Sequence, residues 1–227
     1  MGQTIKVPST APDGFEFSAY HAQPGGTRHA AVIVVQEIFG IDEHIVRDVD
    51  RWAALGYEAL APSLYDRREP GFVSSHSPEG MQAGIAHARG TDMAQAMADL
   101  AACRDRLAAS VPGGKVFIVG YCYGGSLAWL AAADLPGLAG ASSYYGSMVQ
   151  ANATKKPRCP TILHLGRTDA GIPCDAVKAA VQAANPEVAV YIYDDAGHGF
   201  NNEDPARLNA ASADLARERT LALFGGA

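Results

Sequence analysis

One segment of the chain combines residue types and spacing that suit nucleophilic catalysis. Cys122 lies between Gly120 and Gly124, directly after the apolar run 116–119 and before the alanine-rich run 126–133. A strand, a tight turn flanked by small residues and then a helix would hold the thiol in a strained backbone conformation at the end of a sheet. The first amides of the helix and its dipole would favour the negative charge of a thiolate and of an oxyanion. A cysteine in a turn can also be a buried apolar residue, so the motif alone leaves both interpretations open.

Two further residues of catalytic type follow apolar runs later in the chain. Asp169 comes after the run 161–165, and His198, flanked by glycines, comes after the run 188–193. Taken singly, the aspartate could be a turn residue and the histidine a loop residue bound to the backbone. The order Cys122, Asp169, His198 is, however, the order of nucleophile, acid and base in α/β-hydrolases, and it favours a catalytic triad.

The acid partner of His198 has three candidates. Asp194 and Asp195 are close to the histidine in sequence, at the end of the same strand run. Asp169 follows a separate strand, one earlier in the chain. We therefore predict that Asp169 is the orienting acid.

The three side chains together predict hydrolysis through a covalent intermediate. His198 would take the thiol proton or stabilise the thiolate, and Asp169 would fix the imidazole tautomer. The thiolate would attack an ester carbonyl, and water would cleave the resulting thioester. The predicted oxyanion donors are the backbone amides of Tyr123, next to the nucleophile, and Ile38, in the loop after the run 30–35.

Strand and helix patterns alternate from residue 30 to the end of the chain. The alternation predicts an α/β protein with a mostly parallel central sheet and helices on both faces. Together with the order of the triad candidates, it indicates a single α/β-hydrolase domain over residues 1–227. Ligands of such folds bind at the carboxyl ends of the strands, where Glu37 and the three triad candidates fall. Residues 63–80 are expected to form a loop or lid. The expected strands are 4–7, 15–21, 30–35, 57–61, 116–119, 138–145, 161–165 and 188–193, and the expected helices are 42–56, 93–107, 126–133, 175–184 and 206–224.

The composition argues against several classes of function. The 227 residues are 48% hydrophobic and 19% charged, and the net charge of −6 comes without a basic block, which disfavours nucleic acid and anionic membrane partners. No apolar run is long enough to span a membrane, and the N-terminus lacks a secretory signal pattern. The four cysteines form no C-x-x-C motif and have no histidine at metal-ligand spacing, so we expect free thiols and no metal site. A cytoplasmic monomer acting on a small molecule is the simplest expectation.

The sequence resembles the dienelactone hydrolase (carboxymethylenebutenolidase) family of α/β-hydrolases from about residue 14 to residue 224. The segments that carry the resemblance are QEIFG at 36–40, GYCYGG at 120–125, YYG at 144–146, GRTD at 166–169 and AGHGF at 196–200. The resemblance implies a soluble, single-domain hydrolase of small esters or lactones that needs no cofactor. It also implies a triad of Cys122, Asp169 and His198, with Glu37 holding the thiol in a resting orientation until substrate displaces it. Within these segments and just beyond them, we expect Phe39, Tyr145 and Asn202 to contact the substrate.

The sequence departs from the family pattern where relatives grip a substrate carboxylate with arginines. The corresponding stretches, 80–85 and 199–202, contain no arginine, although Arg67, Arg68 and Arg89 are near the first of them. We therefore predict a neutral ester or lactone as substrate. Two alternatives remain open: a general short-chain carboxylesterase or thioesterase without dienelactone activity, and a binding protein that keeps the fold without the chemistry.

Overall fold

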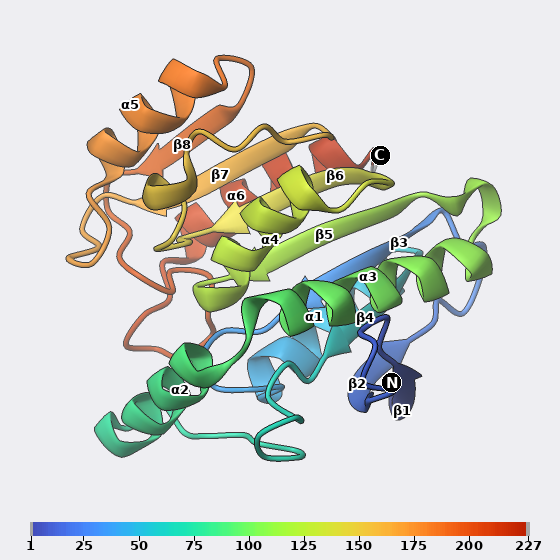
Figure 1. Ribbon diagram of the computed structural model, residues 1–227. Coiled ribbons are helices and arrows are strands. Elements are labelled where there is room, and N and C mark those ends of the chain that lie inside the picture. The colour runs from blue at the N-terminus through green and yellow to red at the C-terminus, as the bar shows by residue number, and fades with distance from the viewer. Residues whose placement is uncertain (1, 226–227) are drawn as a thin grey trace. The chain divides into compact units, whose positions relative to one another are not determined.

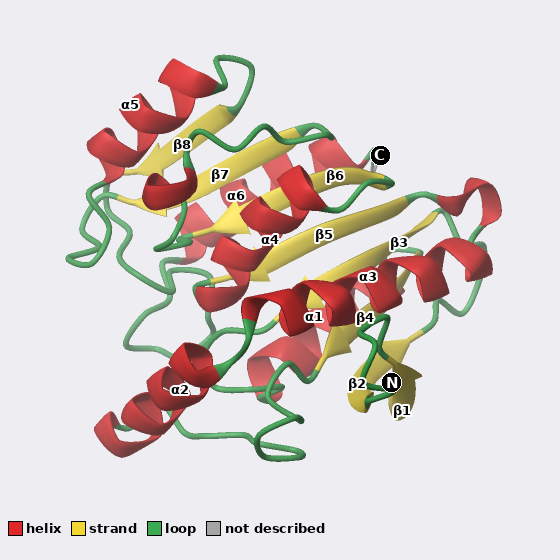
Figure 2. Cartoon of the chain, viewed as in Figure 1, coloured by secondary structure: helices red, strands yellow, loops and turns green. Residues whose placement is uncertain are grey.

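The computed structural model describes residues 2–225, which form an α/β fold with a mostly parallel sheet (Figures 1 and 2). The chain divides into two compact units, one up to Ile118 and one from Val119 onward, and the elements of each are described in turn. The strands are β1 (Gln3–Pro8), β2 (Glu16–Ala22), β3 (Ala30–Val35), β4 (Tyr57–Pro62), β5 (Val116–Tyr121), β6 (Leu138–Tyr144), β7 (Thr161–Gly166) and β8 (Ala189–Tyr193). The helices are α1 (Glu43–Ala54), α2 (Pro78–Gly90), α3 (Met93–Ser110), α4 (Tyr123–Asp134), α5 (Cys174–Ala184) and α6 (Ala210–Phe224).

The first unit orders its strands β1-β2-β4-β3. The β1–β2 hairpin is antiparallel, β2 pairs antiparallel with β4, and β3 runs parallel to β4. Every residue of β3 is buried, as its continuous run of β-branched and small apolar residues predicts. Because β3 is covered on both faces, its end is held firmly in place, and so is the start of the loop that follows it.

Helix α1 begins and ends where its sequence predicts. Asp42 caps the helix, and its side chain accepts a hydrogen bond from the amide of Ile45 at 3.0 Å. Ile45, Val49 and Trp52 form the buried face. Gly56 ends the element with a φ of +89°, a conformation that glycine adopts without a Cβ penalty.

Helix α2 was not predicted, and the expected loop at residues 63–80 ends at its first turn. Ser77 caps α2 and Pro78 is its first residue, which is a common helix start. The helix buries no wide apolar face: among its described residues, Gly84 is the one that is buried. A Cβ at Gly84 would lie 2.4 Å from the carbonyl oxygen of Ile38, so close backbone approach holds α2 against the loop after β3.

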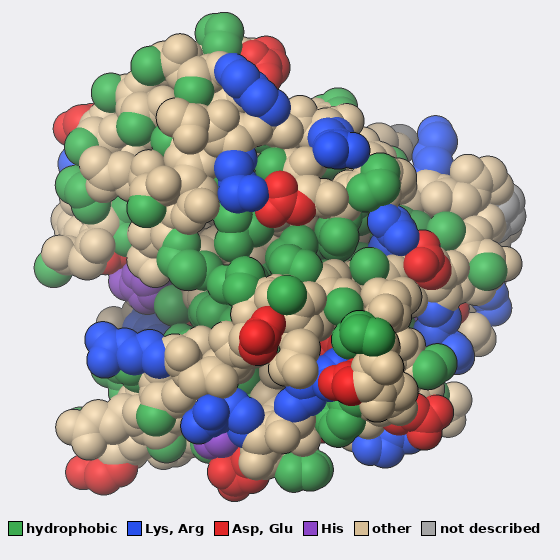
Figure 3. All heavy atoms as spheres, viewed as in Figure 1, with side chains coloured by type: hydrophobic (Ala, Val, Ile, Leu, Met, Phe, Trp, Pro, Cys, Tyr) green, Lys and Arg blue, Asp and Glu red, His purple; other side chains and the backbone are tan. Residues whose placement is uncertain are grey.

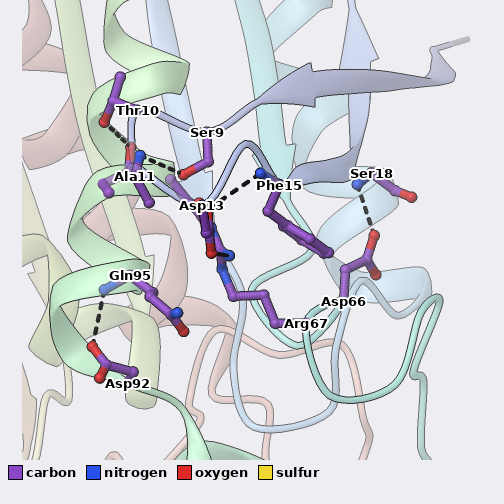
Figure 4. A network of polar contacts seen from close by, with 12 residues as sticks. Ser9, Thr10, Ala11, Asp13, Phe15, Ser18, Asp66, Arg67, Asp92 and Gln95 are labelled. Carbon is purple, nitrogen blue, oxygen red and sulfur yellow. Dashed lines mark hydrogen bonds and ion pairs between the residues drawn. The ribbon is translucent and has the colours of Figure 1, made fainter.

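The loop between β4 and α2 is anchored by buried polar groups (Figure 4). Asp66 accepts hydrogen bonds from the amides of Ser18 at 2.7 Å and Gly71 at 2.9 Å, and from the hydroxyl of Ser63 at 2.6 Å. Burial alone would raise the pKa of the Asp66 carboxyl, but these hydrogen bonds outweigh it and lower the pKa. The carboxylate therefore ties the loop to β2.

Arg67 is part of the same anchoring network (Figure 4). Its guanidinium forms ion pairs with Asp13 in the hairpin turn and, at 2.9 Å, with the buried Asp99 of α3. It also lies over the ring of Phe15, 4.3 Å from the centroid. Arg67 is thus held by three groups of its own unit.

The second unit begins within β5, its strands follow the order β5-β6-β7-β8, and β6, β7 and β8 are parallel. Alternating residues of β6 face opposite ways: Ser143 donates to Gly125 of α4 at 2.7 Å, whereas Ser142 and Tyr144 bond to Thr220 of α6. Helices α4 and α6 therefore cover opposite faces of this part of the sheet, as Figure 1 shows.

The last two helices begin at residues other than those expected. Helix α6 was expected from residue 206 but begins at Ala210, where Asn209 caps it by accepting from the Ser212 amide at 3.0 Å. Helix α5 begins at Cys174, with Pro173 at the cap position. Asp175, where this helix was expected to begin, lies in its first turn and pairs with Arg167.

No helix in the described part of the chain is both long and apolar enough to cross a membrane. On the face drawn in Figure 3, lysine and arginine side chains are interspersed with acidic ones, with apolar side chains between them. Neither sign of charge dominates that face.

Candidate active site

Cys122 lies in a strained turn between β5 and α4. Its φ of +54° and ψ of −112° place it in a region that residues with a Cβ rarely adopt. The surrounding backbone holds this conformation, since the Cys122 amide donates to the Tyr144 carbonyl at 3.0 Å and the Ser126 amide donates to the Cys122 carbonyl at 3.1 Å. The strained turn that the spacing predicts is thus present, with the thiol carried at the N-terminus of α4.

Glycines around the turn allow the strand and the helix to approach closely. A Cβ at Gly120 would lie 2.0 Å from the carbonyl oxygen of Gly124, and a Cβ at Gly125 would lie 2.2 Å from that of Tyr144. Both distances are too short for any side chain, because the nearest atoms belong to the backbone. Gly120 and Gly125 are therefore required by packing.

The turns after β7 and β8 bring an acid and a histidine together. Nδ1 of His198 lies 2.6 Å from Oδ2 of Asp169, whose side chain is 3% exposed. The two turns are joined by their backbones, because the amide of Thr168 donates to the carbonyl of Ala196 at 2.9 Å. A side chain at Gly166 would collide with the Ala196 carbonyl, so the turns also need a glycine there.

The two other candidate acids lie elsewhere. Asp194 is exposed and pairs with Arg167 at 3.3 Å. Asp195 is also exposed, and its backbone carbonyl accepts from the Asn209 side chain at 2.9 Å. Of the three acids considered from sequence, Asp169 is the one that contacts His198.

The protonation of His198 is governed by its two neighbours. Burial alone would lower the pKa of the imidazole, but side-chain hydrogen bonds to Asp169 and to Cys122, together with the charges of both groups, outweigh it and raise the pKa to about 10. Because Nδ1 faces Asp169, Nε2 is the nitrogen available to the thiol. The unit from Val119 onward therefore brings Cys122, Asp169 and His198 into one connected group.

The sequence profile of the dienelactone hydrolase family matches residues 17–227. The chain belongs to this family. It is 37% identical over 237 residues to a protein of Escherichia coli K12 named "Putative carboxymethylenebutenolidase", which covers 95% of this chain and 84% of the relative. It is 32% identical to the carboxymethylenebutenolidase of Pseudomonas putida, with 92% of this chain and 91% of the relative covered.

A solved structure gives the same result for the fold. The crystal structure titled as a putative dienelactone hydrolase of Klebsiella pneumoniae superposes with a TM-score of 0.84 at 30% identity and covers 100% of both chains. Membership in the dienelactone hydrolase family makes this chain a carboxylic ester hydrolase.

Three residues expected at the site belong to the first unit of the chain. Glu37 and Ile38 lie in the loop that follows β3, separated from the strand by Gln36, and Glu37 is 2% exposed. The ring of Phe39, also buried, lies 4.2 Å from the ring of His76. Their actions on the thiol, the oxyanion and the substrate stay predictions. The other expected oxyanion donor, Tyr123, is the first residue of α4, where backbone amides point toward the turn of the nucleophile.

The expected substrate contacts of the second unit are engaged within the protein. The hydroxyl of Tyr145 donates to Oδ1 of Asn201, and Tyr145 is fully buried. Asn202, 1% exposed, accepts from the amide of Asp204 at 3.0 Å. Both side chains shape the loop that carries His198, and direct contact with substrate stays a prediction.

Two residues near the triad were missed from sequence. Cys174 is buried and donates its thiol hydrogen to the Gly166 carbonyl at 2.9 Å, so it supports the turn of Asp169. Arg207 lies against the histidine loop, since a Cβ at Gly199 would be 3.2 Å from its Cδ. Its ion pair is long, at 3.8 Å from Nε to Oδ2 of Asp204. Neither residue has a sequence signal, because each meets its partner only through the folding of the loops.

One side-chain group in the described residues has the composition of a metal site. Glu37, Asp42 and His76 offer ligand atoms within 4.8 Å of one another. Asp42 already caps α1 and lies 3.1 Å from Nε2 of His76. The N-terminal end of a helix dipole also disfavours a cation at this place. We therefore assign these three side chains a structural role in the loop after β3 and not a metal-binding one.

Proposed function

We propose that the chain hydrolyses small esters or lactones through a Cys122 thioester, with His198 as proton carrier and Asp169 as its orienting acid. The observation that carries the proposal is the connected group of three side chains. Cys122 lies in a strained turn at a helix N-terminus and is hydrogen-bonded to His198, and Nδ1 of His198 faces the buried Asp169. Nucleophile, base and orienting group in mutual contact are the signature of covalent acyl transfer.

In the first half-reaction, the Cys122 sulfur attacks the carbonyl carbon of the ester, and the carbonyl oxygen takes the negative charge. The amide of Tyr123 and, we propose, that of Ile38 stabilise this oxyanion. The C–O bond of the ester then breaks, and the imidazolium of His198 gives its proton to the departing alkoxide. The products of this half are an alcohol and a thioester; in a lactone, the alcohol stays joined to the acyl group.

In the second half-reaction, water attacks the thioester carbonyl and gives a proton to His198. The C–S bond breaks, and the products are a carboxylic acid and the Cys122 thiolate, beside a histidine that is again protonated. Asp169 remains ionised throughout and holds Nδ1 of the ring. Because the dipole of α4 favours the thiolate at its N-terminus, the resting enzyme is ready for attack.

The charge of the substrate has two candidate answers. A neutral ester or lactone is favoured because stretches 80–85 and 199–202 lack arginine and Arg67 is held by Asp13 and Asp99. A carboxylate-bearing substrate is favoured by Arg207, whose side chain lies against Gly199 in the histidine loop. Salt dependence of the rate distinguishes the two, because a charge-assisted contact weakens as salt rises.

The first test of the proposed function measures turnover of a short acyl ester and detects the acyl-enzyme by mass spectrometry. We expect multiple turnover and an adduct of the acyl mass on Cys122, with neither in Cys122→Ala. An acyl adduct elsewhere contradicts the assigned nucleophile. Tight binding of esters without turnover by the unmodified protein supports a binding protein instead.

A further inference from the structure

Tyr145 lies directly after β6 and faces His198. The centroids of the phenol and imidazole rings are 4.9 Å apart, with the ring planes at 55°. At this separation the ring is close enough to act on a cationic imidazole through its negative face. Tyr145 comes from a different strand end than the histidine, so its contact is made by the tertiary structure.

The orientation of Tyr145 is fixed at both ends of the residue. Its φ is +39°, which is rare for a bulky side chain and persists only where the surroundings hold it. The Tyr145 amide donates to the carbonyl of His164 at 2.8 Å. At the far end, the hydroxyl donates to Asn201, which lies three residues after His198 in the same turn region.

The turn that carries Tyr145 also supports the nucleophile. The carbonyl of Tyr144 accepts from the amide of Cys122 at 3.0 Å. The next residue, Gly146, has no room for a side chain, because a Cβ would lie 2.7 Å from the amide nitrogen of Ser126 in α4. Two consecutive tyrosines thus hold the nucleophile's backbone and the base's ring from one rigid turn.

We propose that Tyr145 is a positioning residue for His198, its ring holding and stabilising the protonated imidazole while Asn201 locks the phenol in place. The proposal rests on the proposed function in that His198 is taken as the proton carrier. In this proposal Tyr145 contacts His198 and not the substrate, because its phenol hydroxyl is already hydrogen-bonded within the protein and the residue is fully buried.

The experiment compares Tyr145→Leu, which removes the ring, with Tyr145→Phe and Asn201→Ala, which keep the ring and remove the lock. Tyr191→Leu is the matched control, since its ring faces a different histidine, His164, at 5.6 Å. The readouts are the NMR titration of the His198 imidazole and the separate values of kcat and KM for a short ester.

For Tyr145→Leu we expect the His198 titration to move down by about half a unit or more and kcat to fall about tenfold to a hundredfold, with KM little changed. In Tyr145→Phe and Asn201→Ala, the His198 titration midpoint should move less than in Tyr145→Leu, and kcat should fall less. Tyr191→Leu should leave the His198 titration where it is.

A raised KM with an unchanged kcat and His198 titration in Tyr145→Leu overturns the proposal in favour of a substrate contact. If Tyr145→Leu does not fold, unchanged kcat in both Tyr145→Phe and Asn201→Ala overturns it. The NMR titration needs no turnover, so an unmodified protein that hydrolyses no ester contradicts the proposed function while the effect of Tyr145 on His198 is still measured.

Discussion

Oδ2 of Asp169 lies 2.6 Å from Nδ1 of His198, while Oδ1 of the same carboxylate accepts the Gly171 amide at 2.8 Å. One oxygen is therefore used by its own turn and the other by the histidine, which sets the direction of the imidazole. Since Nδ1 is occupied in this way, Nε2 is directed to the thiol of Cys122. The whole proposed mechanism depends on this orientation.

Replacing the acid is expected to be severe and specific to one position. Asp169→Asn should lower kcat/KM by several orders of magnitude, since the analogous change in a serine protease costs about 10⁴-fold by favouring the wrong tautomer. Asp194→Asn is the control, because that carboxylate is exposed and pairs with Arg167. Steady-state kinetics on a short ester measures both variants. A severe Asp194→Asn beside a mild Asp169→Asn contradicts the assignment.

Thiol reactivity should single out Cys122 among the four cysteines. Burial raises the pKa of the Cys103, Cys159 and Cys174 thiols, so their thiolate fractions at neutral pH are small. Cys122 lies at a helix N-terminus beside His198. We expect iodoacetamide to inactivate the enzyme with one equivalent of label, located on Cys122 by peptide mass mapping. Equal loss of activity with label on another cysteine argues against Cys122 as nucleophile.

The activity should fall at alkaline pH. The pKa of His198 is raised to about 10, so the imidazolium that protonates the leaving group is present below that pH and is lost as pH rises through it. The alkaline limb of the kcat/KM profile should therefore have a midpoint near 10 and move to lower pH in Asp169→Asn, because the aspartate is one cause of the raised value. A limb that stays in place in Asp169→Asn means that another group titrates.

Acid should destabilise the fold through a histidine outside the triad. His164 is fully buried between Tyr193 and Thr220, and burial lowers its pKa to about 3. Between about pH 6.5 and 3 the unfolded chain binds a proton that the folded chain does not, so the free energy of unfolding should fall by up to about 1.4 kcal/mol per pH unit. Urea unfolding at pH 7.5 and pH 5 measures this loss. His164→Gln should reduce the loss, and replacement of the exposed His29 by Gln should not; equal losses in all three proteins contradict the prediction.

A matched pair of substrates tests the charge preference. The pair differs only in a carboxylate or its methyl ester, and kcat/KM is measured at low and high salt. With a neutral substrate site, the neutral member should be preferred about tenfold to a hundredfold, because a desolvated carboxylate would lack a charge-assisted contact. A carboxylate preference that salt weakens and Arg207→Gln removes, while Arg89→Ala does not, assigns the anion site to Arg207 and overturns the neutral substrate.

The sequence by itself determined the local architecture of the chain. The turn at Cys122, the cap at Asp42 and the alternation of strands and helices all follow from turn chemistry, helix capping and hydrophobic period, which act over a few residues. The order of the three triad candidates was readable because each follows a strand, and strand ends carry the site in this class of fold.

The tertiary structure decided what no short-range pattern encodes. Helix α2 has almost no apolar face, and it is held by the close approach of Gly84 to a distant carbonyl. The choice of Asp169 over Asp194, the engagement of Arg67 and the ring of Tyr145 beside His198 are contacts between residues far apart in the sequence. Such contacts depend on which strand ends lie next to one another, and that is fixed by the packing of the sheet as a whole.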